Sequence, residues 1–157
     1  MPAKEYHFTR FKQVRINGAF DAEIKKEDAF SVWIDADVLK PVRVKQDGDI
    51  LSIALPWYYY FWGFLTAFTR ARIIISLPDL RKLSITGATH AEIDPFTMVH
   101  DFSLEVAGAS KIRMGELRCG NAVIKIMGSS ELKLEKIVAG DLRAETSGAS
   151  RVLVPLH

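Results

Sequence analysis

Cysteine is almost absent from this sequence, because its 157 residues include only Cys119. One cysteine excludes an intrachain disulfide framework and a metal site built from several cysteines. We interpret Cys119 as a small buried hydrophobic residue rather than a catalytic thiol. The formal net charge is only +2, so the overall charge gives no indication of nucleic-acid binding. The first residues, MPAKEYHFTRFKQ, contain no apolar stretch of the kind found in a secretory signal peptide.

Linkers and low-complexity segments are also missing, which predicts a single domain over residues 1–157. Hydrophobic residues make up 48% of the chain, enough for a core.

The sequence does contain a glycine-centred repeat with a period of about 20 residues. Its clear copies are ITGATHAEI, VAGASKIRM, IMGSSELKL and TSGASRVLV, centred on Gly87, Gly108, Gly128 and Gly148. An earlier copy, VRINGAFDAEI, runs from Val14 to Ile24.

Apolar residues alternate on both sides of each glycine, as in Leu104, Val106, Ile112 and Met114. This alternation is typical of strands with one buried face, and the glycine marks the corner between two strands. A period near 20 residues fits β-solenoids and leucine-rich repeats, but the leucine-rich pattern is absent. We therefore predict an all-β fold, a single-stranded parallel β-helix with about 20 residues per coil.

Charged residues at equivalent positions support this stacking. Strands in neighbouring coils lie about 4.8 Å apart, so like charges in one column would repel each other. From the second copy onward the sign alternates in two outward columns. The column before the glycine comprises Ser84, Glu105, Lys125 and Glu145, and the column after it comprises His90, Lys111, Glu131 and Arg151. A further column of hydroxyls at the corner comprises Thr89, Ser110, Ser130 and Ser150.

The same register predicts which side chains point into the coil. The expected inward residues are Val106, Ile126 and Thr146, together with Leu104, Ile124 and Ala144. Residues 80–157 form the regular coils in this interpretation, whereas residues 11–79 hold the first repeat-like strand and an insertion of hairpins. One hairpin turn is expected at Asp47–Asp49, and Pro78 is expected to end a strand.

The insertion contains the aromatic segment PWYYYFWGFLTAFTR. It is too short to cross a membrane as a helix, because Ile50 to Leu55 already has the pattern of a strand. Two interpretations remain open: packing beneath the hairpins or over one end of the coils, and an exposed patch for a membrane interface or self-association. The candidate interaction residues are Trp57, Tyr58, Tyr59, Tyr60, Phe61, Trp62, Phe64, Phe68, Arg70 and Arg72.

The order of the motifs resembles one bacterial family. FKQVRINGAFDAEI near the start, then LPDLRKLSITGATHAEI, then glycine-centred repeats are similar to the family called putative auto-transporter adhesin, head GIN domain. The resemblance implies a right-handed parallel β-helix built on an N-terminal strand-rich section. It also implies a protein that is exported or attached to the cell envelope, without an established enzymatic activity.

We predict no catalytic, cofactor-binding or metal-binding residues. Polysaccharide lyases and hydrolases with this architecture need clustered carboxylates, whereas charges of alternating sign would neutralise such a groove. Neighbouring acidic and histidine residues, such as His90 with Glu92 and His100 with Asp101, are interpreted as surface residues. The sequence therefore favours a noncatalytic, envelope-associated adhesion or assembly module. The alternative is a carbohydrate-active β-helix enzyme.

Three expectations concern partners and location. A last repeat without a covering element exposes strand edges, which predicts a homo-oligomer. The aromatic segment is a candidate contact with a membrane surface or another envelope component, and nucleic acid is not an expected partner. The expected location is the cell envelope or the exterior, with the cytoplasm as the alternative.

Overall fold

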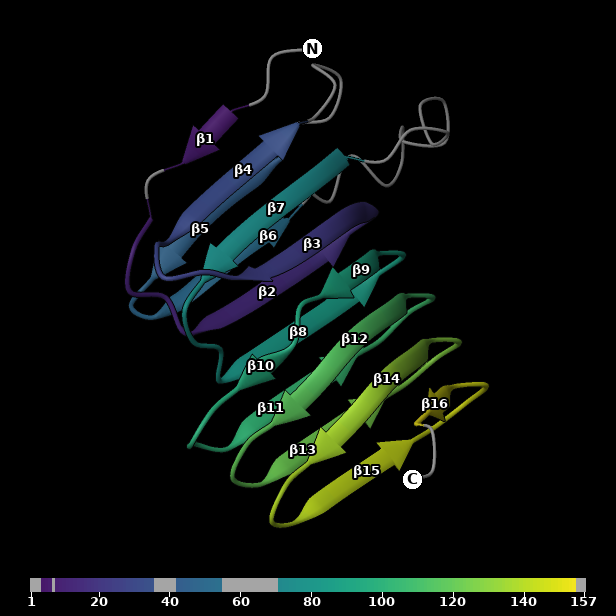
Figure 1. Ribbon diagram of the computed structural model, residues 1–157. Helices are drawn as coiled ribbons and strands as arrows, with labels where there is room; N and C mark the ends of the chain where they lie inside the picture. The colour runs from purple at the N-terminus through teal and green to yellow at the C-terminus, as the bar shows by residue number, and fades with distance from the viewer. Residues whose placement is uncertain (1–3, 7, 36–41, 55–70, 155–157) are drawn as a thin grey trace.

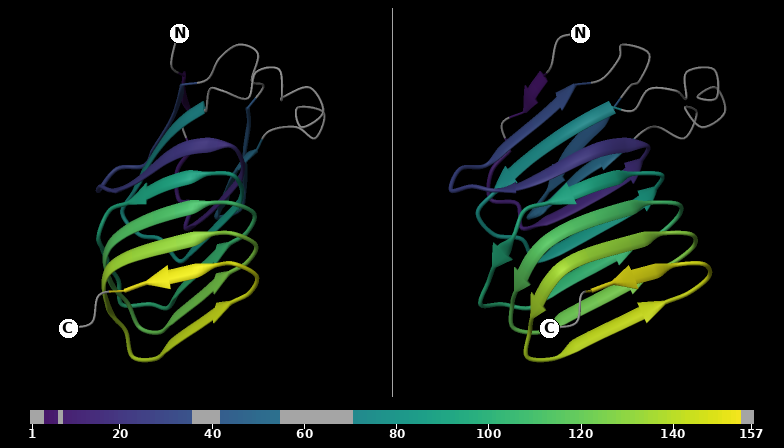
Figure 2. Two further views of the ribbon diagram at one scale, coloured as in Figure 1. Left: turned by 90° about the vertical axis from the view of Figure 1, so that its right-hand side faces the viewer. Right: turned by 45° about the vertical axis from the view of Figure 1, so that its right-hand side comes forward.

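The computed structural model describes residues 4–6, 8–35, 42–54 and 71–154 (Figure 1). Within these ranges the chain forms β-strands and no helix, which confirms the all-β prediction. The strands belong to two mixed sheets, a nine-stranded sheet A and a seven-stranded sheet B. The two sheets face each other across a shared interior (Figure 2).

Sheet A runs in the order β1-β4-β7-β3-β9-β12-β14-β16, with β10 paired beside β12. Its strands are β1 (Lys4–Tyr6), β3 (Phe20–Lys26), β4 (Ser31–Asp35), β7 (Ala71–Leu77), β9 (His90–Ile93), β10 (Phe96–Thr97), β12 (Lys111–Arg118), β14 (Glu131–Val138) and β16 (Arg151–Leu153).

Sheet B runs in the order β15-β13-β11-β8-β2-β6-β5. Its strands are β2 (Gln13–Gly18), β5 (Arg43–Asp47), β6 (Ile50–Ala54), β8 (Lys82–Gly87), β11 (Phe102–Val106), β13 (Ala122–Ile126) and β15 (Leu142–Thr146).

Equivalent strands of successive repeats pair in parallel, as the sequence predicts. The strand before each repeat glycine lies in sheet B, and the strand after it lies in sheet A. The earlier copy joins the same register, because β2 pairs with β8 so that Gly18 lies beside Gly87. The alternating charge columns are in register as well, with Lys125 between Glu105 and Glu145.

Each corner brings backbone from successive repeats very close together. Gly87 has a φ of +97°, and a Cβ at this position would lie 2.6 Å from the carbonyl oxygen of Gly18. The buried hydroxyl of Thr89 donates a 2.7 Å hydrogen bond to that same carbonyl. Ser110 repeats the arrangement, donating to the Gly87 carbonyl at 3.2 Å. The predicted hydroxyl column therefore exists, and its members bond to the glycine carbonyls of the preceding repeat.

The interior is apolar and mostly follows the predicted register. Ile126 is 0% exposed and Ile124 is 1% exposed, as expected, and Leu104 and Val106 are also buried. Ala144 and Thr146 align with Ile124 and Ile126, as the stacking prediction requires, but both are exposed. Their strand, β15, is the outermost strand of sheet B, so no further described repeat packs against it.

The N-terminal section adds strands to one end of both sheets. In sheet B, β5 and β6 form the predicted antiparallel hairpin, with Gly48 in the turn at a φ of +62°. In sheet A, β4 runs antiparallel to both β1 and β7. β7 ends at Leu77, immediately before Pro78, as predicted. Val32, Leu51 and Ile53 from this section are 0% exposed, so it shares the core of the repeats.

Candidate ligand groove on sheet A

A charged groove lies on the outer face of sheet A, where it crosses β7, β3, β9, β12 and β14. It has a volume of about 660 Å³. Its lining includes Ala22, Ala91 and Ile112, which are 3%, 3% and 2% exposed. Every other lining residue is charged or is histidine: Asp21, Glu23, Arg72, His90, Glu92, Lys111, Arg113, Glu131 and Lys133.

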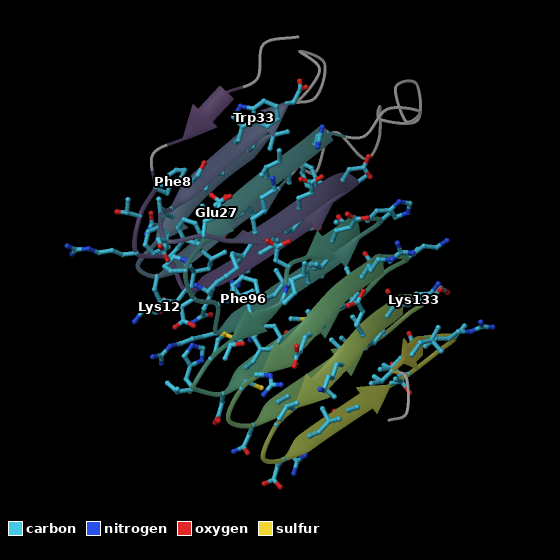
Figure 3. The ribbon with its side chains drawn as sticks, in the orientation of Figure 1. Phe8, Lys12, Glu27, Trp33, Phe96 and Lys133 are labelled. Carbon is cyan, nitrogen blue, oxygen red and sulfur yellow. The ribbon has the colours of Figure 1, made fainter. Side chains whose placement is uncertain are left out.

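Two columns of side chains form the sides of the groove. The first column contains Asp21, His90, Lys111 and Glu131, which are neighbours in the strand register. The second column contains Glu23, Glu92, Arg113 and Lys133, the last of which is labelled in Figure 3. Two residues along a strand span roughly 7 Å, and each step to the next strand is about 4.8 Å. The two columns are therefore spaced as alternate residues of one strand face.

The second column does not alternate in sign. Glu23 lies beside Glu92, then Arg113 lies beside Lys133, so two carboxylates are followed by two cations. The expectation that alternation neutralises this face is therefore wrong for the second column. The sequence contains the signal, since these residues each follow a repeat glycine by the same distance, but the reasoning from sequence considered only two other columns.

Ion pairs compensate only part of this charge. The Arg72 guanidinium lies 3.2 Å from a carboxylate oxygen of Glu23, and the Lys133 ammonium lies 3.9 Å from that of Glu131. Within the described ranges, no salt bridge of 4.0 Å or less involves Glu92, Lys111 or Arg113. β12 therefore places two exposed cations without a close salt bridge on the same side of the sheet, although Glu131 and Glu92 are the cross-strand neighbours of Lys111 and Arg113.

Of the candidate interaction residues, only Arg72 lies in the described part of the chain. It is exposed on β7 and lines one end of the groove. The remaining candidates lie outside the described residues: Trp57, Tyr58, Tyr59, Tyr60, Phe61, Trp62, Phe64, Phe68 and Arg70. Within the described ranges, no helix has the length and hydropathy needed to cross a membrane.

Cys119 is half-buried, and its thiol donates a 3.7 Å hydrogen bond to the Asn121 carbonyl rather than to any histidine of the described residues. Burial raises the pKa of its thiol, and the nearby charge of Asp101 raises that pKa further, so the unreactive protonated form is favoured. The ring of His100 is held elsewhere, with Nε2 2.6 Å from Asp79 Oδ1 and Nδ1 2.8 Å from the Asp101 carbonyl. Both ring nitrogens face oxygen atoms, so neither is placed to accept a proton from the thiol.

A second corner of each repeat carries a column of acidic and amide side chains that the reasoning from sequence missed. Asp101 accepts a 2.9 Å hydrogen bond from the backbone N–H of Asn121. Asn121 in turn accepts a 3.0 Å bond from the N–H of Asp141. Their regular spacing in the sequence was the available signal. These side chains satisfy corner backbone groups, which is a structural role. Among the described residues, no group of three or more histidine, cysteine or acidic residues could hold a metal ion.

The fold is similar to several solved bacterial structures. A "putative adhesin" from Bacteroides fragilis NCTC 9343 matches with a TM-score of 0.69 and 11% identity, covering 98% of this chain and 96% of that one. A "putative lipid binding protein" from Parabacteroides distasonis ATCC 8503 matches with a TM-score of 0.60 and 13% identity, covering 99% and 96%. At such low identity these matches support the fold alone.

Comparison with curated proteins gives no match. The family described as "Putative auto-transporter adhesin, head GIN domain" matches residues 10–154, which is nearly the whole chain. The glycine-centred repeats and the earlier copy at β2 and β3 all lie inside this range. The chain therefore belongs to the auto-transporter adhesin head GIN domain family.

Proposed function

We propose that this protein is a noncatalytic adhesion or assembly module of the cell envelope. The observation that carries the proposal is the charged groove, an open binding surface built on paired strands. The close-packed core fixes the strands of sheet A, so the side chains on its outer face lie at regular spacings. Regular spacing suits recognition of a repeating ligand. The description of the family and the names of the similar structures support an exported or surface location.

The open groove does not favour the alternative of a carbohydrate-active enzyme. A glycosidase needs a carboxylic acid that burial keeps protonated at neutral pH, paired with a second carboxylate. In this groove the side chains of Asp21 and Glu23 are 55% and 33% exposed. Glu23 is also paired with Arg72, whose guanidinium lies 3.2 Å from its carboxylate. These contacts support binding rather than proton transfer.

We also propose that residues 1–157 form one right-handed β-helix, with regular coils over residues 80–157 and the hairpin insertion within residues 11–79. The parallel pairing of equivalent strands in both sheets supports the coils. The right hand follows from the strong preference of parallel crossover connections for that hand. A crystal structure with left-handed coils would contradict this proposal.

Self-association is the third part of the proposal. All residues of β15 are exposed, and the apolar side chains of Leu142 and Leu153 are 49% and 44% exposed. A second copy pairing along β15 and β16 would satisfy the outer strand edges and cover these side chains. The aromatic segment, with Arg70 and Arg72, is retained as a proposed contact with a membrane surface or an envelope component.

Adhesion is tested by coating beads with the purified protein and measuring their retention on intact bacteria and isolated envelopes. We expect saturable retention that free protein competes away. Retention no greater than that of beads coated with an unrelated β-protein would contradict the proposal. Incubation with acidic and neutral polysaccharides provides the enzymatic control, since release of reducing ends or unsaturated sugars would favour the enzyme alternative.

A further inference from the structure

We propose that the charged groove binds an acidic saccharide, with an anionic group of the sugar between Lys111 and Arg113. Sugar hydroxyls then donate hydrogen bonds to the carboxylates of Asp21, Glu23 and Glu92. This inference rests on the proposed binding function and specifies the chemistry of its ligand.

The anion-binding position is on β12. Lys111 and Arg113 are separated by one residue, so their side chains leave the same face of the strand. Both are exposed, and neither forms a salt bridge within the described part of the chain. The next strand adds Lys133 beside Arg113, although Glu131 partly compensates it. A planar guanidinium can bind a carboxylate or sulfate through two hydrogen bonds, and an ammonium adds a third.

The carboxylates on β3 and β9, on one side of β12, limit the chemistry of the rest of the ligand. Glu23 and Glu92 are neighbours in the second column, and Asp21 lies across the groove from Glu23. Ionised carboxylates accept hydrogen bonds and cannot donate them. The part of the ligand above β3 and β9 must therefore carry donors and little negative charge. Hydroxyl-bearing sugar rings meet this requirement, whereas a nucleic acid, with an anion on every residue, is repelled.

The groove offers little to a peptide or an acyl chain. Its apolar lining residues, Ala22, Ala91 and Ile112, are almost completely buried, so the groove itself offers no apolar pocket for a side chain or a lipid tail. A separate hollow of about 570 Å³, lined in part by Val152, Leu153 and Val154, adjoins it only at Arg113 and Lys133. The groove-lining parts of β3, β9, β12 and β14 are each paired on both sides, so no strand edge within the groove is free for an added peptide strand. Polar recognition of side groups remains, which again favours a saccharide.

Exposed ion pairs are individually weak, so binding of one short saccharide is expected with a dissociation constant on the order of 1 mM. Several protein copies on one surface would bind a polysaccharide much more tightly through multivalency. Weak monovalent binding is therefore compatible with adhesion.

The test is a titration of ¹⁵N-labelled protein with short hyaluronan oligosaccharides, in which only every second sugar carries a carboxylate, followed by two-dimensional NMR. We expect saturable shifts in backbone amides of β9, β12 and β14. The methyl esters of the same saccharides keep most hydroxyls and lose the charge, so they should bind at least about tenfold more weakly. Polyphosphate, a dense polyanion without hydroxyl rings, should also bind at least about tenfold more weakly. Equal binding of either control would overturn the proposal.

The variant Lys111→Gln/Arg113→Gln should lose about tenfold or more in affinity. Its matched control is Lys45→Gln/Lys125→Gln, which removes the same charge from sheet B and should bind like the unchanged protein. Equal losses in both variants would show nonspecific attraction and would overturn the assignment of the site. Melting curves establish that both variants fold, since all four positions lie on outward or half-exposed faces.

The two proposals fail in different ways. If no acidic saccharide binds but the coated beads still adhere, the saccharide inference is wrong and the adhesion function stands. If saccharides bind through Lys111 and Arg113 but the beads do not adhere, the inference stands and the adhesion function is wrong.

Discussion

Replacing Ile126 with alanine tests the strand register of sheet B, which packs against the sheet that carries the groove. Ile126 is 0% exposed, and its strand lies between those of Val106 and Thr146. Truncating a buried isoleucine costs about 2–5 kcal/mol, because transfer energy is lost and a cavity forms. The neighbouring Lys125 points outward and is half-exposed, so Lys125→Ala should cost less than about 1 kcal/mol. The two adjacent substitutions are thus predicted to differ several-fold in how much they lower the free energy of unfolding.

Position 146 extends the same test into the next repeat. Thr146 aligns with Ile126 but is exposed, so Thr146→Ala should change the free energy of unfolding by no more than about 0.5 kcal/mol. Ile126→Asp should be worse than Ile126→Ala by several kcal/mol, because it buries an unpaired charge. In a protein with a typical stability of about 5–15 kcal/mol, that variant is close to unfolding.

Urea denaturation followed by circular dichroism measures these differences. A loss of 3 kcal/mol should also lower the melting temperature by roughly 6–12 °C for a chain of this size. If Lys125→Ala destabilises more than Ile126→Ala, the assigned register of sheet B is wrong. If Thr146→Ala costs as much as Ile126→Ala, then β15 is covered in solution, which would support self-association through that strand.

Three further predictions follow from individual sites. Gly87→Ala should destabilise by more than about 2 kcal/mol and Gly48→Ala by about 1 kcal/mol in thermal melts, because both need a positive φ but only position 87 also meets backbone; equal losses would contradict the close contact at the corner. The raised pKa of Cys119 reduces its thiolate fraction at neutral pH, so iodoacetamide should alkylate it more slowly than free cysteine. The alkylation rate should rise at higher pH and in the variant Asp101→Asn. Alkylation at the rate of free cysteine would show an accessible, unperturbed thiol. Leu142→Lys should reduce the average mass seen by light scattering at high protein concentration, whereas a strict monomer in the unchanged protein would refute association through β15.

Much of the fold could be predicted because the repeat is regular. In a parallel stack with a constant period, the residue above any position is found by adding that period, so strand pairing follows from arithmetic. This is how Lys125 could be placed between Glu105 and Glu145, whereas Gly18 could be matched to Gly87 across a long insertion through the similarity of the two motifs. The second column of the groove was predictable in the same way, since Glu92 and Arg113 occupy equivalent positions.

The N-terminal section was less predictable, because it has no repeat. Nothing local in the sequence indicates that β4 pairs antiparallel with β7. Strand alternation reports which face is buried, whereas the choice of partner depends on residues far away in the chain. The β5–β6 hairpin was the exception, because the Asp47–Asp49 turn makes its pairing local.

The sequence by itself determined the strands, the glycine corners and the vertical neighbours of each outward charge. Only the tertiary structure decided which of those charges remain uncompensated, because side-chain reach sets whether neighbouring charges meet. Glu23 meets Arg72 from the insertion, while Lys111 and Arg113 form no close salt bridge among the described residues. The tertiary structure also decided that Thr146 is exposed, because burial depends on what packs against a strand. The residue type alone does not show what packs there.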